Sequence, residues 1–183
     1  MLPRIPQMDP IMSDNLNNNS VALAGEFAVL SQLALQGYDA NLTLGRTKSV
    51  DILVSHPKTG KMFKLEVKTN YRSSRSAGGS SKLFGNYVSS WIMNEKHEII
   101  RDPSLFYCFV NIAKDGHAFR FFIVPSTVVA EYVKGQHKLW LDAKDTHSRK
   151  NKMRTFRVCK KGEKCPLPTP TIEEYENNWE FKN

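Results

Sequence analysis

Two acidic residues and a lysine lie within one short stretch of this 183-residue chain. Asp51 stands in a β-rich run, and Glu66-Val67-Lys68 ends the next such run, after a short loop that contains proline and glycine. Side chains alternate across a strand, so Glu66 and Lys68 share one face. Two carboxylates and an amine can therefore converge beside an apolar core, which is the minimum equipment for metal-assisted phosphodiester hydrolysis.

The chemistry of Mg²⁺ assigns a role to each of these residues. Mg²⁺ prefers oxygen ligands and takes one or two carboxylates together with water and phosphate oxygens. We predict Asp51 and Glu66 as ligands of Mg²⁺ or Mn²⁺, with the backbone carbonyl of Val67 able to complete the shell. Such a metal polarises a phosphoryl group and activates water. Lys68 would orient or deprotonate that water and stabilise charge on the phosphate.

The alternative interpretation is a solvated hairpin face with an ordinary Glu–Lys pair. The tripeptide Glu-x-Lys is common, and taken alone it favours this alternative. Asp51 counts against it, because it lies in the apolar run 50–54. A strand that is covered on both faces normally excludes charge.

Glu26 is a second acidic residue in an unusual place. The expected helix around it carries an apolar stripe formed by Leu23, Phe27, Leu30 and Ala34. Glu26 points near this stripe, and the neighbouring Gly25 permits close backbone approach. Glu26 either reaches the metal site from the helix or extends to solvent from the edge of the stripe, and the helix pattern alone leaves both open.

The order of these residues resembles the PD-(D/E)XK nuclease superfamily, most closely its small Holliday-junction-resolvase-like and restriction-endonuclease-like members. Gly25-Glu26 lies in an N-terminal helix, Asp51 in a strand and Glu66-Val67-Lys68 in the next strand. The resemblance covers about residues 20–70. It departs from the pattern in the family's name at residue 50, where valine replaces a proline that is variable in the family.

The resemblance implies a fold, an activity and a set of functional residues. The fold is a restriction-endonuclease-like α/β fold, with a central mixed β-sheet flanked by helices. The activity is that of a metal-dependent endonuclease that hydrolyses DNA phosphodiester bonds with Mg²⁺ or Mn²⁺. The catalytic residues are Glu26, Asp51, Glu66 and Lys68. A homodimer is expected as well, because a small nuclease often needs a second copy to cut both strands.

The rest of the sequence predicts an α/β domain between two tails. Residues 1–19 are expected to be flexible, 20–165 to form the nuclease-like domain, and 166–183 to form a proline-rich tail. The domain's helix at 20–36 begins at Ser20 as N-cap and ends before Gly37. The other expected elements are a strand at 38–44, a hairpin of 50–54 with 61–68, a loop at 71–82, a weakly marked helix at 86–98, a hairpin of 105–113 with 117–124, a helix at 127–134 ended by Gly135, and an edge strand at 154–158.

Basic residues predict a polyanionic partner, which we take to be DNA. The chain has 26 lysine and arginine residues against 18 acidic ones, a net charge of +8. Eleven of the basic residues lie between 134 and 164. The predicted nucleic-acid contacts are Arg72, Arg75, Lys82, Arg149, Lys150, Lys152 and Arg154. Phosphate contacts of this kind weaken steeply with salt. The alternative is a solvated basic loop, which is the usual role of a charge run.

Cysteine and hydropathy patterns bear on location. The chain has no apolar leader and no apolar stretch long enough to span a membrane, so we expect a cytoplasmic protein without membrane contact. Cys108, Cys159 and Cys165 are expected to be reduced thiols. The histidines show no metal-ligand spacing and are interpreted as structural or surface residues.

A second functional class remains open at this point. The same fold could serve a non-catalytic nucleic-acid-binding protein or complex subunit, and a basic scaffold whose tails bind a protein is a third possibility. Clustered carboxylates argue against a pure binder, because they repel phosphates.

Overall fold

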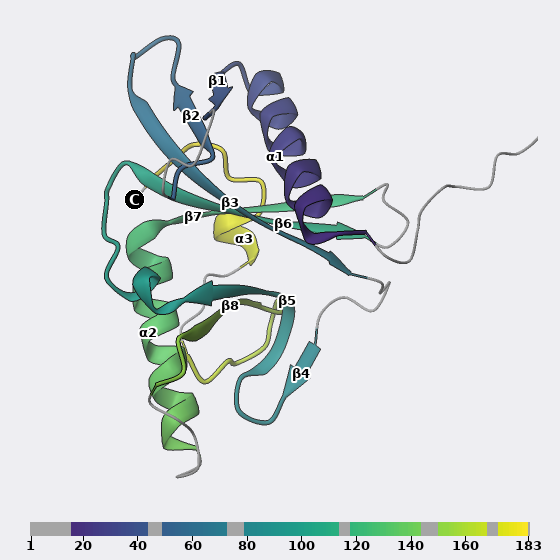
Figure 1. Ribbon diagram of the computed structural model, residues 1–183, viewed down its shortest axis with the longest axis vertical. Helices are drawn as coiled ribbons and strands as arrows, with labels where there is room; N and C mark the ends of the chain where they lie inside the picture. The colour runs from purple at the N-terminus through teal and green to yellow at the C-terminus, as the bar shows by residue number, and fades with distance from the viewer. Residues whose placement is uncertain are drawn as a thin grey trace, which may run out of the picture.

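The computed structural model describes residues 16–43, 49–72, 79–113, 118–143, 150–167 and 172–182. Most of the elements in these ranges are strands, with a helix near each end of the described chain and one before the last strand (Figure 1). In chain order they are α1 (Asn18–Leu35), β1 (Asp39–Leu42), β2 (Ile52–Ser55), β3 (Met62–Arg72), β4 (Gly79–Ser81), β5 (Gly85–Asn94), the 3₁₀ turn η1 (Glu95–Glu98), β6 (Leu105–Ala113), β7 (Phe119–Pro125), α2 (Ser126–Asp142), β8 (Met153–Cys159) and α3 (Ile172–Tyr175).

The described strands form two sheets. The larger one has the order β1-β2-β3-β6-β7, and the smaller one has the order β4-β5-β8. Strand β3 pairs antiparallel with β2 and parallel with β6, so the larger sheet is mixed. In Figure 1, α1 lies on one side of the long strands β3 and β6, and the smaller sheet with α2 lies on the other. The expected α/β fold with a central mixed sheet flanked by helices is confirmed.

Strand β6 separates two hydrophobic cores, because its side chains alternate between the faces of the sheet. Cys108 and Val110 belong to the core under α1. Tyr107 and Phe109 belong to the core under α2 and the smaller sheet. Strand β3 follows the same alternation and places Val67 in the first core. The even-numbered residues of β3 therefore point toward the second layer.

Helix α1 begins and ends close to the predicted positions. Asn17 is its N-cap, and the Asn17 side chain accepts a hydrogen bond of 2.8 Å from the backbone N–H of Ser20. The predicted N-cap, Ser20, thus lies inside the first turn. Gly37 follows the helix with a φ of +79°, a conformation that glycine adopts without strain.

The buried face of α1 differs from the predicted stripe. Gly25, Val29 and Leu33 are buried, at a spacing of four residues. Leu23 is 49% exposed and Phe27 is 55% exposed. Because Gly25 has no side chain, the helix packs closely against the sheet along this line, and the large apolar residues beside it face outward.

The predicted helix at 86–98 is wrong. Residues 85–94 form strand β5, which pairs antiparallel with β8, and a 3₁₀ turn follows at 95–98. Val88, Trp91 and Met93 are buried on the side of the second core. The stretch is rich in aromatic and β-branched residues, and its partner strand is β8 (Met153–Cys159), whose paired residues lie 59 to 72 positions further along the chain. Long-range pairing therefore decides its structure.

Helix α2 continues past its predicted end at Gly135. It runs from Ser126 to Asp142, with Gln136 and His137 buried in its second half. The Gln136 side chain accepts a 3.1 Å hydrogen bond from the backbone N–H of Thr155 in β8. Such tertiary contacts outweigh the loss of helix stability that a glycine causes.

The C-terminal segment packs onto the domain. Trp179 and Phe181 are buried in the core under α1. The hydroxyl of Tyr38 donates a 2.8 Å hydrogen bond to the Trp179 carbonyl. Arg120 of β7 forms an ion pair with Glu176. These contacts make the end of the predicted tail a part of the hydrophobic core.

Two further expectations concern cysteines and membranes. Cys159 and Cys165 form a disulfide, so the expectation that all thiols are reduced is wrong for this pair. Cys108 is free and buried. Among the described residues, no helix has the length and apolar content needed to cross a bilayer.

Candidate active site

The candidate site lies where β3 extends beyond its pairing with β2. The paired registers end at Ile52 and Leu65. Asp51 then continues the contact, since its backbone N–H donates to the Leu65 carbonyl at 2.7 Å and its Oδ2 accepts from the Val67 N–H at 2.7 Å. The carboxylate thus occupies the place of a strand carbonyl and is fixed beside Glu66.

Glu66 is the most buried charged group of the site. It is 3% exposed, and it lies beside Tyr107 in the parallel register of β3 and β6. The Lys68 ammonium is 2.6 Å from Glu66 Oε1, and the Nε2 atom of His97 is 3.4 Å from the same oxygen. Glu66 Oε2 is also buried but has no hydrogen-bond partner among the described residues. One carboxylate oxygen is therefore held and the other is unpartnered.

The pKa values of the carboxyls follow from burial and neighbouring charges. Burial raises the pKa of Glu66, but the hydrogen bond from His97 and the charge of Lys68 outweigh it and lower the pKa to about 2. Burial raises the pKa of Asp51, while the Val67 N–H and Lys68 oppose this shift. Burial and then the charge of Asp51 raise the pKa of Glu26. The site thus combines one carboxyl whose pKa is lowered with two whose pKa values are raised by burial.

Glu26 of α1 lies near the same site, and its part in holding a metal stays a prediction. Its pKa responds to both Asp51 and Lys68, which places the three charged groups near one another. Gly25 sets the approach of the helix, because a Cβ built there would lie 1.9 Å from Thr69 Oγ1 and 2.9 Å from Thr69 Cβ. The expected close approach at Gly25 is confirmed. Any larger residue would push α1 away from β3.

A groove of about 400 Å³ begins at Lys68 and follows β3. Its lining comes from α1 and the segment before that helix, from β3 and from β5. The lining residues are Leu16, Asn18, Val21, Lys68, Thr69, Asn70, Tyr71, Ser90, Trp91 and Ile92. Among the residues that the structure describes, no acidic side chain lines the groove, and Lys68 is its charged member. The groove therefore offers a path next to the carboxylates that does not repel a polyanion.

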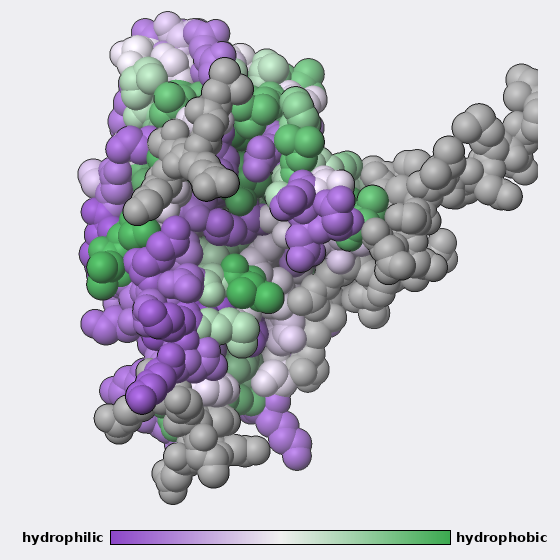
Figure 2. All heavy atoms as spheres, viewed as in Figure 1, coloured by the Kyte–Doolittle hydropathy of each residue, from purple (hydrophilic) through white to green (hydrophobic). Residues whose placement is uncertain are grey.

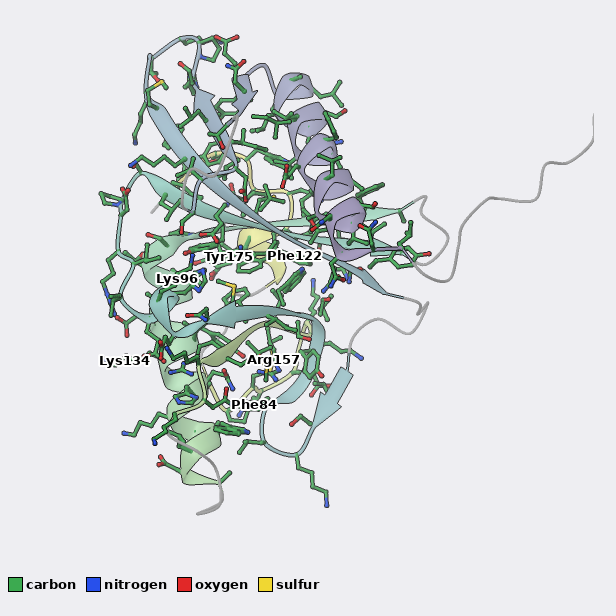
Figure 3. The ribbon with its side chains drawn as sticks, in the orientation of Figure 1. Phe84, Lys96, Phe122, Lys134, Arg157 and Tyr175 are labelled. Atoms are coloured by element: carbon green, nitrogen blue, oxygen red, sulfur yellow. A yellow bond between two sulfur atoms is a disulfide. The ribbon has the colours of Figure 1, made fainter. Side chains whose placement is uncertain are left out.

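The η1 turn supplies two residues of the site that sequence reasoning missed. His97 is 3% exposed and contacts Glu66. Lys96 projects from the turn (Figure 3), its ammonium bonds to Ser49 Oγ at 3.1 Å, and its charge lowers the pKa of Asp51. The one local signal was the spacing of Asn94 and His97, which is that of a capping box.

The predicted nucleic-acid contacts differ in their exposure and in whether the structure describes them. Arg75, Arg149 and the side chain of Arg72 lie outside the part of the chain that the structure describes. The backbone of Arg72 belongs to β3. Lys82, Lys150 and Lys152 are exposed, and Lys152 is 3.3 Å from Glu95. Figure 2 shows hydrophilic residues over the outer side of α2.

Arg154 differs from the other predicted contacts. It is 6% exposed, forms an ion pair with Glu98 through its Nε atom, and donates through Nη1 to the carbonyls of Asn151 and Met153 at 2.7 and 3.0 Å. Its guanidinium is engaged inside the protein, so we leave it out of the proposed nucleic-acid interface.

The donor set of the site fits Mg²⁺ or Mn²⁺ with two protein carboxylates. Asp51 and Glu66 offer hard oxygen ligands, and the unpartnered Glu66 Oε2 is a buried atom that lacks the ligand it would normally have. Within the described ranges, no three His, Cys, Asp or Glu side chains are placed to hold one ion together. The set therefore suits an ion that also takes water and phosphate oxygens. The Val67 carbonyl as a ligand stays a prediction.

Comparisons with known proteins identify no family for this chain. The sequence matches no known protein family, and no curated protein matches it. A solved structure of a bacterial homing endonuclease, I-Ssp6803I, is similar over 89% of this chain and 88% of that chain, with 12% identity and a TM-score of 0.46. At that TM-score the likeness assigns neither fold family nor function.

Proposed function

We propose that this protein is a metal-dependent endonuclease of the PD-(D/E)XK type that hydrolyses DNA phosphodiester bonds. The observation that carries the proposal is the convergence of Asp51, Glu66 and Lys68 at the free part of β3. These three charges meet around a buried carboxylate with an unpartnered oxygen, and Glu26 approaches from α1. A purely structural ion pair requires neither the second and third carboxylate nor the unpartnered oxygen.

Each residue has a distinct role in the proposed reaction. Asp51 and Glu66 hold Mg²⁺ or Mn²⁺ and keep their positions through the Val67 N–H and His97. When bound, the metal supplies Lewis-acid polarisation of the phosphoryl group and a lower pKa for attacking water. Lys68 is 29% exposed, so its ammonium can contact a phosphate oxygen and stabilise the charge that develops there. Glu26 is an additional carboxylate at the rim.

DNA is the proposed substrate because charge and shape both suit a polyanion. The net charge is +8, and the described lining of the groove that begins at Lys68 contains no acidic residue. The exposed lysines 82 and 150 can neutralise phosphates further from the cut. Two copies are proposed to act together, since one site cleaves one strand at a time.

A substrate panel tests the proposal. The substrates are supercoiled plasmid, linear duplex, single strand, flap and four-way junction, each with Mg²⁺, Mn²⁺ or EDTA. Metal-dependent cutting that EDTA abolishes supports the proposal, and the pattern of cutting gives the preferred DNA shape. Salt-sensitive binding of every substrate without cutting, in both metals, would overturn it in favour of a non-catalytic nucleic-acid-binding protein. Size-exclusion chromatography with multi-angle light scattering gives the molar mass of the protein in solution and hence the number of copies.

A further inference from the structure

His97 lies at the junction of the two layers, on a turn that the motif of Glu26, Asp51, Glu66 and Lys68 does not include. We propose that His97 is a positioning residue, whose Nε2–H fixes the Glu66 carboxylate so that Oε1 is held and Oε2 stays available. This role rests on the proposed function, because it concerns the same carboxylate. It adds to that function a residue from another part of the chain.

The ring of His97 is fixed on the side away from Glu66. The backbone N–H of Asn94 lies 3.0 Å from His97 Nδ1, and the Asn94 carbonyl lies 2.8 Å from the same atom. The Asn94 side chain accepts from the Lys96 N–H, which completes a capping box around the turn. Tyr107 packs against the ring in an edge-to-face arrangement, with 5.7 Å between ring centres and an angle of 67° between the ring planes. At 3% exposure, the imidazole has little freedom to turn.

The chemistry of the partner decides which ring nitrogen carries a proton. An ionised carboxylate accepts hydrogen bonds and donates none. Glu66 Oε1 lies 3.4 Å from Nε2, so a stabilising contact requires the proton on Nε2. In the neutral ring, Nδ1 then accepts from the Asn94 N–H. The turn itself offers Nδ1 both a donor, the Asn94 N–H, and an acceptor, the Asn94 carbonyl, so it is the carboxylate of Glu66 that requires the proton on Nε2.

The two donors on Oε1 determine the orientation of the carboxylate. Lys68 approaches Oε1 at 2.6 Å and His97 approaches it at 3.4 Å, while Oε2 forms no hydrogen bond of normal geometry in the described part of the chain. Burial and then the nearby charge of Glu66 raise the pKa of the Tyr107 hydroxyl, which lies close to the carboxylate. Lys68 is flexible and partly exposed, so it alone leaves the carboxyl plane free to rotate. The rigid imidazole removes this freedom. Partners of this kind outside the ligands themselves typically change metal affinity or activity about 10–100-fold.

Two substitutions separate positioning from packing. His97→Phe keeps the ring volume but removes both nitrogen atoms. His97→Gln keeps an acceptor for the Asn94 N–H, as glutamine does in a capping box, and keeps a donor that can face Glu66. We expect His97→Phe to lower the single-turnover cleavage rate about 10–100-fold with the Kd for DNA unchanged, and His97→Gln to recover most of the rate.

A matched control addresses the turn itself. Asn94→Ala removes the side-chain half of the capping box but leaves the contact between His97 and Glu66. We expect it to lower the melting temperature as much as His97→Phe does while retaining cleavage. A His97→Phe variant that cleaves at the wild-type rate would overturn the proposal, as would a well-folded His97→Gln variant as slow as His97→Phe.

A spectroscopic measurement on the metal-free protein is independent of cleavage. Long-range ¹⁵N NMR of the imidazole reports which nitrogen carries a proton, and we expect a proton on Nε2 whose resonance shifts in Glu66→Gln. A proton on Nδ1 alone would overturn the proposal. If the protein cleaves nothing but the Nε2 signal responds to Glu66→Gln, the proposed function fails while the contact between His97 and Glu66 stands.

Discussion

The β3 edge and strand β8 both carry charged residues that the sequence marked as functional, yet the fold uses them differently. At the β3 edge, Asp51, Glu66 and Lys68 share one small space, and one buried oxygen is left unpartnered. On β8, Arg154 forms an ion pair with Glu98.

The other charges near β8 are likewise engaged locally. Lys152 is 3.3 Å from Glu95. Arg157 lies with its guanidinium 4.1 Å from the centre of the Phe84 ring (Figure 3). A high density of basic residues in a sequence is therefore a weak guide to nucleic-acid binding. Arg157 also has buried nitrogens, Nε and Nη1, without a hydrogen-bond partner in the described part of the chain, but they belong to a single cation beside an aromatic ring. The β3 edge differs because two carboxylates and a lysine converge there on one small space.

The largest expected effect is at the β3 edge. Asp51→Asn keeps the shape of the side chain but removes the charge that the proposed metal needs, so we expect cleavage to fall about 10³-fold or more. The protein should remain folded, because an amide oxygen at this position can still accept the hydrogen bond from the Val67 N–H. Single-turnover cleavage and circular dichroism measure the two properties. A wild-type cleavage rate in Asp51→Asn would show that the β3 edge resembles β8 after all.

Arg154→Met should act on stability. Removing the guanidinium leaves Glu98, whose side chain is 22% exposed, without its partner, and we expect a loss of about 3 kcal/mol in the free energy of unfolding. Urea denaturation measures it. Lys152→Ala is the matched control, since its side chain is 71% exposed and its ion pair should contribute less than about 1 kcal/mol. Weaker DNA binding by Arg154→Met at unchanged stability would contradict this assignment.

Gly25→Ala tests how closely α1 must approach the β3 edge. The added Cβ meets Thr69 atoms at 1.9 and 2.9 Å, so the helix or the strand has to move. We expect a loss of about 1–3 kcal/mol in stability, as for other overpacked sites. Ala24→Ser, at an exposed position of the same helix, should change stability by less than about 0.5 kcal/mol. Equal stability of the two variants would mean that the packing is looser than described.

The pH dependence of stability gives the smallest expected effect. The pKa of Glu66 is lowered from 4.5 to about 2 in the folded protein. Its contribution to stability is therefore present above pH 4.5 and is lost as the pH falls toward 2. Urea denaturation between pH 5 and pH 3 should show a steeper loss in the wild type than in Glu66→Gln. The raised pKa of Asp51 acts in the opposite sense, because its contribution is lost as the pH rises through that pKa. Identical slopes for wild type and Glu66→Gln would contradict the assignment.

The sequence predicted the β3 edge because its signals are local. Alternation along one strand places Glu66 and Lys68 on the same face, and a charge within an apolar run marks Asp51. The glycine before Glu26 indicates close packing of the helix. These inferences need a few neighbouring residues and no knowledge of distant ones. The mixed sheet flanked by helices followed from the same pattern together with the family resemblance.

The misassigned parts depend on distant partners. Residues 85–94 become a strand because β8 pairs with them, and α2 continues past Gly135 because Gln136 bonds to β8. Arg154 is buried because the η1 turn supplies Glu98. His97 was missed for the same reason, since its partner Glu66 is 31 residues away. Contacts between the two layers join residues that are far apart in the sequence, so local sequence patterns do not predict them.

Cleavage by wild type and Lys68→Ala, purified identically and run side by side on the substrate panel with Mg²⁺ or Mn²⁺, tests the central claim most directly. Lys68→Ala removes a partner of the buried Glu66 but leaves its contact with His97, so we expect some loss of stability, a fold that circular dichroism shows to be retained, and no cutting. Metal-dependent cutting by the wild type alone is the result that this account predicts. Equal cutting by both proteins would contradict it, because the activity would then arise from a contaminant or from another site.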